Sequence, residues 1–284
     1  MRHVRSVALP SHGSAGVALA VAGLPFPRFS TRIEPPQSAE CATVAAEYVR
    51  AMRTRLPPAL PQDRLAADLA EHGYAMSRLL EPATCRMLAA LYDDDGRFRS
   101  RVVMQRHGFG RGEYKYLAYP LPEPVAALRA ALYPPLAAIA NGWRAALGEA
   151  ARFPATLDGF LAECHAAGQT RPTPLLLRYG AGDYNCLHQD LYGALVFPLQ
   201  VTVLLSEPGA DFTGGEFVLV EQRPRAQSRP VVVTLAQGEA VIFPVHHRPV
   251  QGARGPHRVT MRHGVSRVHS GRRHTLGVIF HDAA

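Results

Sequence analysis

The sequence predicts an α+β protein with a double-stranded β-helix, or jelly roll, as its core. Two observations predict this fold class. Helical patterns dominate residues 61–170, and short apolar runs separated by turn residues dominate residues 171–284. Many short strands after a helical half are typical of a jelly roll buttressed by helices. The chain has 284 residues, 47% of them hydrophobic, which is enough for one large domain with an extension.

Residues 1–60 are predicted to be a poorly ordered N-terminal extension. Ala15–Leu24 is apolar and follows Arg2 and Arg5, which resembles a signal peptide. Pro10–Gly13 interrupts that pattern and no clear small-residue cleavage site follows, so we favour a tail or a start site placed too early. The prolines at positions 57, 58 and 61 mark the start of the domain, residues 61–284.

The helical half, residues 61–170, supports the core. Its predicted helices are Arg64–His72, Pro82–Tyr92, Val125–Leu147 and Leu157–Ala167. Its predicted strands are Tyr74–Leu80, Phe98–Arg106 and Glu113–Tyr119. The glycine-rich Gly108–Gly112 lacks a following helix and is therefore a hairpin rather than a nucleotide-binding loop. With Arg106, Arg111 and Lys115 beside it, this hairpin is a candidate lid over a substrate.

The second half, residues 171–284, is predicted to form the jelly roll. Its expected strands are 175–179, 196–205, 216–221, 230–235, 240–245, 257–265 and 273–280. Phe212–Glu216 is expected to be a tight turn, and Glu216 in it is a candidate to lie near a substrate.

Charge is distributed unevenly along the chain. The net charge is +4 in residues 1–60, −3 in 61–220 and +7 in 221–284, and Lys115 is the only lysine. A GC-rich genome favours arginine codons without any functional reason. A basic face for phosphates is the functional interpretation. Arg223–Arg229 is accordingly either a solvated loop or an arm that contacts phosphate, and the sequence leaves both open.

Cysteine usage and hydropathy bear on location. Cys41, Cys85, Cys164 and Cys186 are scattered without a CxxC spacing, as expected in a reducing cytoplasm. No stretch approaches the ~20 apolar residues of a membrane span. We therefore expect a cytoplasmic protein without membrane association, and nothing in the sequence indicates an obligate protein partner.

A histidine and a carboxylate lie one residue apart at the end of Leu175–Asp190, LLLRYGAGDYNCLHQD. On an extended chain, residues i and i+2 point to the same side, so His188 and Asp190 converge on one point. They form two-thirds of a facial triad of two histidines and one carboxylate, the ligand set of non-haem Fe(II) oxygenases. Among 13 histidines such a pair also arises by chance, so the rest of the sequence must support it.

A second histidine ligand must then come from a distant strand. The candidates are His246, His247, His257, His263, His269, His274 and His281. A 2-oxoglutarate cosubstrate needs a fixed cation for its far carboxylate, and the planar guanidinium of arginine suits this role. That arginine should lie on the strand after the distal histidine, beyond a turn.

His263 and Arg273, separated by an expected turn at Ser270–Gly271, satisfy this requirement. His257 with Arg267 has the same spacing, but Arg267 runs directly into the turn, so we prefer the first pair.

Arg272 is the fallback cation. Alternation from Thr275 and Gly277 inward places Arg273, not Arg272, on the lumen face.

The stretch Arg178-Tyr179-x-x-Gly182-x-x-x-x-Leu187-His188-Gln189-Asp190 resembles the approach to the first metal ligands of AlkB-type nucleic-acid demethylases. His263-Gly264-Val265 followed by Arg273 resembles the second half of that signature. From about Asp63 onward, the chain also resembles a bacterial family of 2-oxoglutarate/Fe(II) oxygenases described as acting on damaged nucleic acid. The resemblance covers the catalytic core closely and the N-terminal extension not at all.

The resemblance implies a site and its cofactors. It implies Fe(II) held by His188, Asp190 and His263, with O2 and 2-oxoglutarate as the other reactants. It implies that Arg273 binds the cosubstrate carboxylate and that Tyr179 donates a hydrogen bond to the cosubstrate.

One departure from the AlkB pattern bears on the substrate. AlkB-type enzymes carry R-x-N-x-T-x-R on the closing strand, whereas here Thr275, Gly277 and Ile279 follow Arg273. A single basic residue is closer to the prolyl-hydroxylase pattern.

The sequence therefore predicts a 2-oxoglutarate/Fe(II)-dependent dioxygenase that hydroxylates its substrate and releases succinate and CO2. Alkylated DNA or RNA is the favoured substrate, and hydroxylation of an N-methyl group would release formaldehyde. A prolyl-type protein or amino-acid hydroxylase is the alternative. A jelly-roll protein that binds a metal or ligand without turnover is the alternative of another class, although such a protein has no use for a carboxylate-binding arginine.

Overall fold

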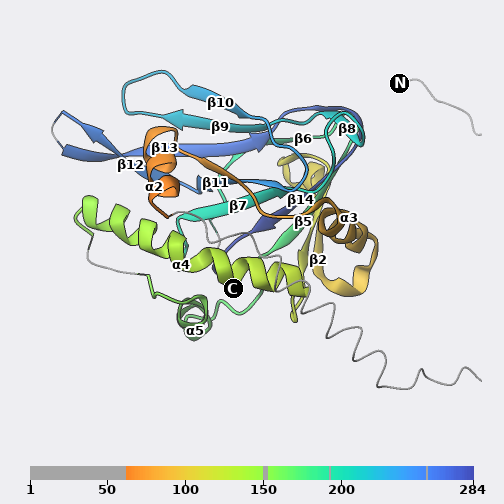
Figure 1. The fold of residues 1–284 in the computed structure, drawn as a ribbon, viewed down its shortest axis with the longest axis horizontal. Coiled ribbons are helices and arrows are strands. Elements are labelled where there is room, and N and C mark those ends of the chain that lie inside the picture. Colours follow the sequence, from red (N-terminus) through yellow and green to blue (C-terminus); the bar gives the residue numbers. More distant parts are fainter. Residues whose placement is uncertain (1–61, 150–152, 192, 254) are drawn as a thin grey trace, which may run out of the picture. The chain divides into compact units, whose positions relative to one another are not determined.

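The computed structural model describes residues 62–149, 153–191, 193–253 and 255–284, which form one compact unit (Figure 1). The predicted extension, residues 1–60, lies outside the described residues. No helix in the described ranges is long and apolar enough to cross a membrane.

Four α-helices carry the helical half. They are α2 (Gln62–Glu71), α3 (Pro82–Ala90), α4 (Glu123–Ala146) and α5 (Leu157–Ala166). Short 3-10 turns, η1 (Leu91–Asp93), η2 (Asp95–Arg97) and η3 (Met104–His107), connect the strands between α3 and α4. Helix α3 begins with Pro82, where the missing N–H costs no hydrogen bond. Thr156 caps α5 by accepting a hydrogen bond from the Gly159 N–H.

The larger sheet has eight strands in the order β1-β11-β7-β14-β5-β4-β2, with β8 paired to β14. Their bounds are β1 (Ala75–Arg78), β2 (Phe98–Val103), β4 (Glu113–Leu117), β5 (Leu175–Gly180), β7 (Leu199–Leu204), β8 (Phe212–Gly214), β11 (Glu239–Pro244) and β14 (Val268–Val278). Every pairing in it is antiparallel.

The smaller sheet has six strands in the order β10-β9-β13-β6-β3, with β12 also paired to β13. Their bounds are β3 (Gly110–Arg111), β6 (Tyr184–His188), β9 (Phe217–Gln222), β10 (Arg229–Val233), β12 (His247–Gly252) and β13 (Gly255–Val265). Two facing antiparallel sheets with helices against one of them make the predicted double-stranded β-helix, so the fold class is confirmed.

Apolar side chains fill two layers. One cluster packs the helices against the larger sheet and includes Leu132 of α4, Val203 of β7 and Leu276 of β14. Figure 1 shows α4 running along β7 of that sheet. The second cluster lies between the two sheets and includes Phe217 of β9 and Phe243 of β11. A strand of the larger sheet is therefore buried on both faces, and all six residues of β7 are buried, the polar Gln200 and Thr202 included.

The structure corrects three parts of the predicted strand pattern. Strands β6 and β12 were not predicted, and the expected turn at Phe212–Glu216 contains the short strand β8. The expected turn at Ser270–Gly271 is wrong, because these residues lie inside β14 and the break between β13 and β14 falls at 266–267. Gly271 instead allows a close approach: a Cβ there would lie 2.0 Å from the Asp211 carbonyl oxygen.

Candidate active site

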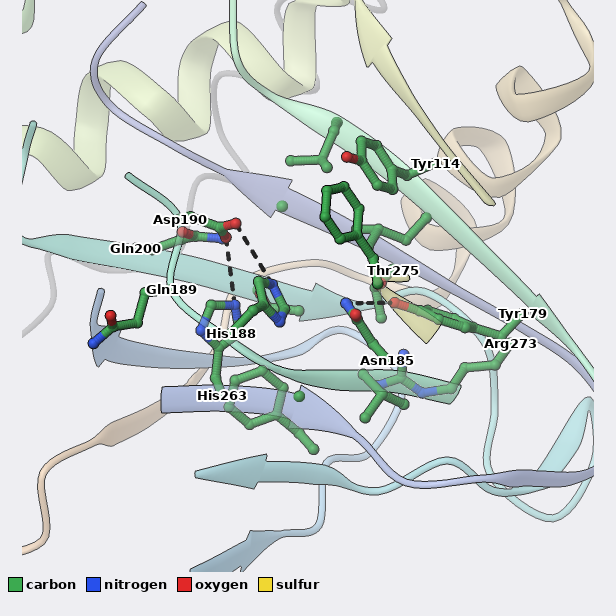
Figure 2. Close-up of a pocket in the computed structure, with 18 residues that line it drawn as sticks. Tyr114, Tyr179, Asn185, His188, Gln189, Asp190, Gln200, His263, Arg273 and Thr275 are labelled. Atoms are coloured by element: carbon green, nitrogen blue, oxygen red, sulfur yellow. Dashed lines mark hydrogen bonds and ion pairs between the residues drawn. The ribbon is translucent and has the colours of Figure 1, made fainter. Parts of the chain in front are cut away.

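Three side chains with metal-ligating atoms meet between β6 and β13. His188 ends β6 and is paired in register with His263 of β13, while Asp190 follows two residues later. The Asp190 Oδ1 lies 3.5 Å from His188 Nε2, and its Oδ2 lies 3.4 Å from His263 Nε2. Figure 2 shows the carboxylate facing both rings. Within the described ranges, this is the one group of three or more such residues whose ligand atoms all lie within 4.8 Å of one another.

The backbone around the triad holds the two strands close together. A Cβ at position 264 would lie 2.7 Å from the Asn185 carbonyl oxygen, so glycine is required where β13 passes β6. The Gln189 amide donates to the Met261 carbonyl oxygen at 2.8 Å, which ties the residue between His188 and Asp190 to the strand that carries His263. This contact fixes the separation of the His-x-Asp segment from His263.

The two imidazoles have different surroundings. His188 Nδ1 lies 2.8 Å from the Cys186 carbonyl oxygen, so the proton belongs on Nδ1 and the lone pair of Nε2 is directed at Asp190. Burial and then the neighbouring His263 lower the pKa of His188, which favours the neutral form that binds metals.

His263 is held by packing instead. Its ring lies 4.6 Å from the Phe243 ring centroid and stacks on Phe217 at 5.9 Å, and its buried Nδ1 has no hydrogen-bond partner.

A cavity of about 190 Å³ opens between the sheets next to the triad. Its lining is mainly apolar, with a few polar groups converging from both sheets. The polar lining residues outside the triad include Tyr179, Asn185, Gln200, Thr202, Arg273 and Thr275. A largely apolar pocket with few fixed polar groups is typical of a small-molecule site.

Arg273 lies in the wall of this cavity with unused donors. Its side chain is 2% exposed, and its Nε and Nη1 have no hydrogen-bond partner. Burial lowers the pKa of Arg273 to about 10, so the guanidinium remains charged at neutral pH. A buried donor without a hydrogen bond costs free energy, so this guanidinium is suited to bind an anionic group that enters the cavity. The free donors fit the carboxylate of a keto acid, and the triad fits a ferrous ion.

Tyr179 lies beside that guanidinium. The Arg273 Cζ is 5.6 Å from the Tyr179 ring centroid, and the Asn185 amide donates to the Tyr179 hydroxyl at 3.4 Å (Figure 2). Burial raises the pKa of Tyr179 above its ordinary range, so the phenol stays protonated and can donate a hydrogen bond to an acceptor in the cavity.

The comparisons with known proteins agree with this chemistry. The family Oxygenase-NA, described as "Oxygenase, catalysing oxidative methylation of damaged DNA", matches residues 112–283, which contain the triad, Tyr179 and Arg273. The chain belongs to this oxygenase family. It is a 2-oxoglutarate/Fe(II) oxygenase, an oxidoreductase whose reactants include Fe(II), 2-oxoglutarate and O2.

Relatives of the oxygenase occur in Mycobacterium tuberculosis. Two uncharacterized proteins, from strains CDC 1551 and H37Rv, are each 51% identical over 190 residues, covering 67% of this chain and 79% of the relative.

Solved structures similar to it include a prolyl-4-hydroxylase from Pseudomonas putida, with 16% identity and a TM-score of 0.43, covering 78% of this chain and 99% of that one. Another is an oxidoreductase of the 2OG-Fe(II) oxygenase family from Burkholderia pseudomallei, with 17% identity and a TM-score of 0.42, covering 80% and 94%.

The alternative ligands weighed from the sequence lie away from the oxygenase cavity. His257 is exposed at the far end of β13, and Arg267 lies over the Tyr184 ring with its Cζ 5.7 Å from the centroid. Arg272 is exposed, on the opposite side of β14 from Arg273. The structure therefore brings His188, Asp190, His263, Arg273 and Tyr179 together and leaves the alternatives outside.

Two residues expected near a substrate have other roles. Lys115 is buried, and its Nζ donates to the Tyr92 carbonyl oxygen at 2.7 Å and to Asp95 Oδ1 at 2.6 Å. The prediction that Lys115 belongs to a lid over the substrate is therefore wrong. Glu216 accepts a hydrogen bond from Ser266 and does not line the cavity beside the triad.

Acidic side chains offset part of the positive surplus of residues 221–284. Arg223, Arg229 and Arg248 all contact the buried carboxylate of Glu221. Arg258 contacts Glu149, and Arg273 is buried in the cavity. Five of the nine arginines that the structure describes in this segment are thus paired with an acid or buried, so net charge alone overstates the positive surface available to phosphate.

Sequence reasoning missed several cavity residues. Gln200 lines the cavity from β7, and its buried Oε1 has no hydrogen-bond partner. The only sign of it in the sequence is a polar residue between apolar residues of the strand. Asn185 and Phe109 also line the cavity. No sequence pattern marks Asn185 as a cavity residue. Phe109 lies in the glycine-rich segment Gly108–Gly112, which the sequence predicts as a candidate lid.

Proposed function

We propose that the oxygenase hydroxylates N-alkyl groups of damaged nucleic acid, with release of succinate and CO2. His188, Asp190 and His263 hold Fe(II), Arg273 binds the distal carboxylate of 2-oxoglutarate, and Tyr179 donates a hydrogen bond to that cosubstrate. Hydroxylation of an N-methyl group gives a hemiaminal, which loses formaldehyde and restores the unmodified base.

The single observation that carries the cosubstrate role is the buried guanidinium of Arg273. A buried cation with two unused donors is expensive, and a carboxylate is the group that would satisfy its charge and its fork of donors together. It lines the same cavity as the triad, so one ligand between them would be held at both ends.

Each residue then has a limited task. The triad would hold a ferrous ion with two imidazole nitrogens and one carboxylate oxygen. Fe(II) bound there would couple the oxidative decarboxylation of 2-oxoglutarate by O2 to hydroxylation of a substrate C–H bond. Phe217 and Phe243 exclude water around His263, and Gln189 keeps the His-x-Asp segment against β13.

Nucleic acid as the substrate rests on the description of the family, which names damaged DNA. The sequence resemblance to AlkB-type demethylases supports the same class. A base inside a duplex cannot reach a cavity between two sheets, so the enzyme must act on single strands or on a flipped base.

The test combines substrate and ligand variants. Enzyme loaded with Fe(II) and 2-oxoglutarate is incubated with N-methylated single- and double-stranded oligonucleotides, and succinate and formaldehyde are measured together. We expect equimolar formation of both, and loss of both products together with loss of Mn(II) binding in His188→Ala, Asp190→Ala and His263→Ala. Two remaining ligands do not hold a labile divalent ion.

His257→Ala is the matched control, because it removes an exposed histidine from the same strand as His263. Full activity in His263→Ala with loss of activity in His257→Ala would contradict the ligand set. Succinate formation that no methylated oligonucleotide stimulates, but that a proline-containing peptide does, would replace the nucleic-acid substrate with a prolyl-type one. Metal binding without any succinate would leave only a binding protein.

A further inference from the structure

The cavity of the oxygenase has an exposed aromatic side chain at its edge. Phe109 lines the cavity together with the triad, yet 47% of the residue is exposed to solvent. An aromatic side chain that only completes a core would be buried. This ring instead belongs to both the pocket and the surface, so it faces whatever enters.

The backbone of Phe109 is fixed from two sides. Its N–H donates to the Met104 carbonyl oxygen at 3.1 Å, and its carbonyl oxygen accepts from the Cys186 N–H at 2.9 Å. The next residue, Gly110, is paired with Asn185 of β6, the strand that ends in His188. The position of the ring is therefore tied to the strand that carries the first candidate ligand.

The ring plane of Phe109 is also set. It stacks on the His107 imidazole, with 5.3 Å between ring centroids and 23° between planes. Exposed arginines, Arg106 and Arg111, flank this pair on either side in the sequence. Arg111 Nε lies 3.9 Å from Asp183 Oδ1, a distance too long to occupy the guanidinium fully.

We propose that Phe109 stacks on the nucleobase that carries the alkyl group, with the nearby arginines on its phosphates. The proposal rests on the nucleic-acid function above and makes it specific, because it names the residue that recognises a planar heterocycle. Every base presents a π-face, so such a contact is strong without being selective for sequence. A fixed aromatic ring next to the triad would hold the base with its substituent towards the metal.

A second explanation of the same geometry is that Phe109 merely covers the cavity as an apolar side chain. The two explanations predict different effects of replacing Phe109 with leucine. Leucine covers apolar surface about as well as phenylalanine but has no π-face, whereas tryptophan has a larger one. Phe109→Leu, Phe109→Trp and Phe109→Ala therefore separate stacking from cover.

The experiment measures the affinity of a fluorescent single-stranded oligonucleotide, with one N-methylated base, for enzyme loaded with Mn(II) and 2-oxoglutarate. We expect binding to weaken by roughly 5- to 150-fold in Phe109→Ala, the range of one base–aromatic stack. Phe109→Leu should lose nearly as much, and Phe109→Trp should retain or improve the affinity. Affinity for 2-oxoglutarate should be unchanged in all three.

Leu187→Ala is the matched control, since Leu187 is 45% exposed on β6 but does not line the cavity. Wild-type affinity in Phe109→Leu, or an equal loss in Leu187→Ala, would overturn the stacking role while leaving the nucleic-acid function in place. A wild-type enzyme that neither binds nor demethylates the oligonucleotide would overturn both.

Discussion

Three of the arginines that the structure describes in the oxygenase are almost fully buried, and they differ in what they contact. Arg129 and Arg248 are each 1% exposed and each contacts a buried carboxylate: Arg129 Nη2 lies 2.8 Å from Asp282 Oδ1, and Arg248 Nε lies 3.1 Å from Glu221 Oε2. Arg273 is 2% exposed and, within the described residues, has no ion pair.

The first two arginines also satisfy backbone groups. Arg129 donates to the carbonyl oxygens of Ile279 and Phe280, which fixes the end of the chain against α4. Arg248 donates to the carbonyl oxygen of Ala70 near the end of α2. The difference teaches that a buried arginine with a full set of partners maintains structure, whereas one with unused donors is suited to bind a ligand.

The largest expected effect tests the structural side of this comparison. Arg129→Met should lower the free energy of unfolding by about 3–5 kcal/mol, because it leaves Asp282 buried with less compensation. Chemical denaturation of the variant and the wild type measures the change. Arg258→Gln is the control, because its pair with Glu149 is half exposed and should contribute no more than about 1 kcal/mol. Equal losses in the two variants would remove the distinction between buried and exposed pairs.

The next effect tests the ligand side. Arg273→Gln should weaken 2-oxoglutarate binding by ~2–4 kcal/mol, roughly 30- to 1000-fold, because a charge-assisted contact is lost. Mn(II) affinity should stay nearly constant. Without cosubstrate, the stability of the variant should equal or exceed that of the wild type, since an uncompensated buried cation is removed. Titration calorimetry and thermal unfolding, with and without 2-oxoglutarate, measure these quantities.

Arg272→Gln provides the control for Arg273, because its side chain is exposed on the other side of β14. Loss of cosubstrate affinity in that variant, with normal affinity in Arg273→Gln, would contradict the comparison.

The smallest effect concerns pH and the environment of Arg129. Burial, and then the charge of Arg129, lower the pKa of His281 from its usual 6.5 to about 4. His281 Nδ1 also accepts a hydrogen bond from the Phe197 N–H at 3.2 Å, so the neutral ring is the form that fits. Above pH 6.5 both the folded and unfolded chains hold a neutral ring, and the residue adds no pH dependence.

As the pH falls from about 6.5 to 4, the unfolded chain gains this proton and the folded chain does not, so stability decreases. His281→Gln should flatten the dependence of Tm on pH within that window. His274, whose pKa burial also lowers to about 4, should account for part of the slope that remains. An unchanged slope in His281→Gln would show that the ring is already charged in the folded protein.

The sequence predicted the parts of the site that follow from strand alternation. His188 and Asp190 converge because they lie two residues apart, and Arg273, Thr275 and Gly277 all line the cavity, as alternation along β14 requires. These inferences depend on local geometry alone, which a single sequence contains.

The parts that depend on distant contacts could not be predicted in this way. Gly271 has the pattern of a turn, but it is required by the approach of Asp211, sixty positions earlier. Lys115 has the pattern of a surface charge, yet it is buried with Asp95 and the Tyr92 backbone. Strand β6 lacks a clear apolar alternation because it contributes two polar residues, Asn185 and His188, to the cavity lining. The net charge of a segment does not show which arginines are paired with acids, so the prediction of nucleic-acid contact from charge could not include those pairs.

One feature of the fold limits which changes of chain length the oxygenase can tolerate. His263 lies in the smaller sheet and Arg273 in the larger one, and only the residues 266–267 connect their strands. The ten-residue interval between them therefore determines which face of β14 carries Arg273 when His263 lies beside His188. Inserting or deleting one residue there would turn Arg273 to the opposite face of β14. Insertions and deletions should occur instead in segments such as 223–228, between β9 and β10, because the length of that segment does not affect the position of any cavity residue.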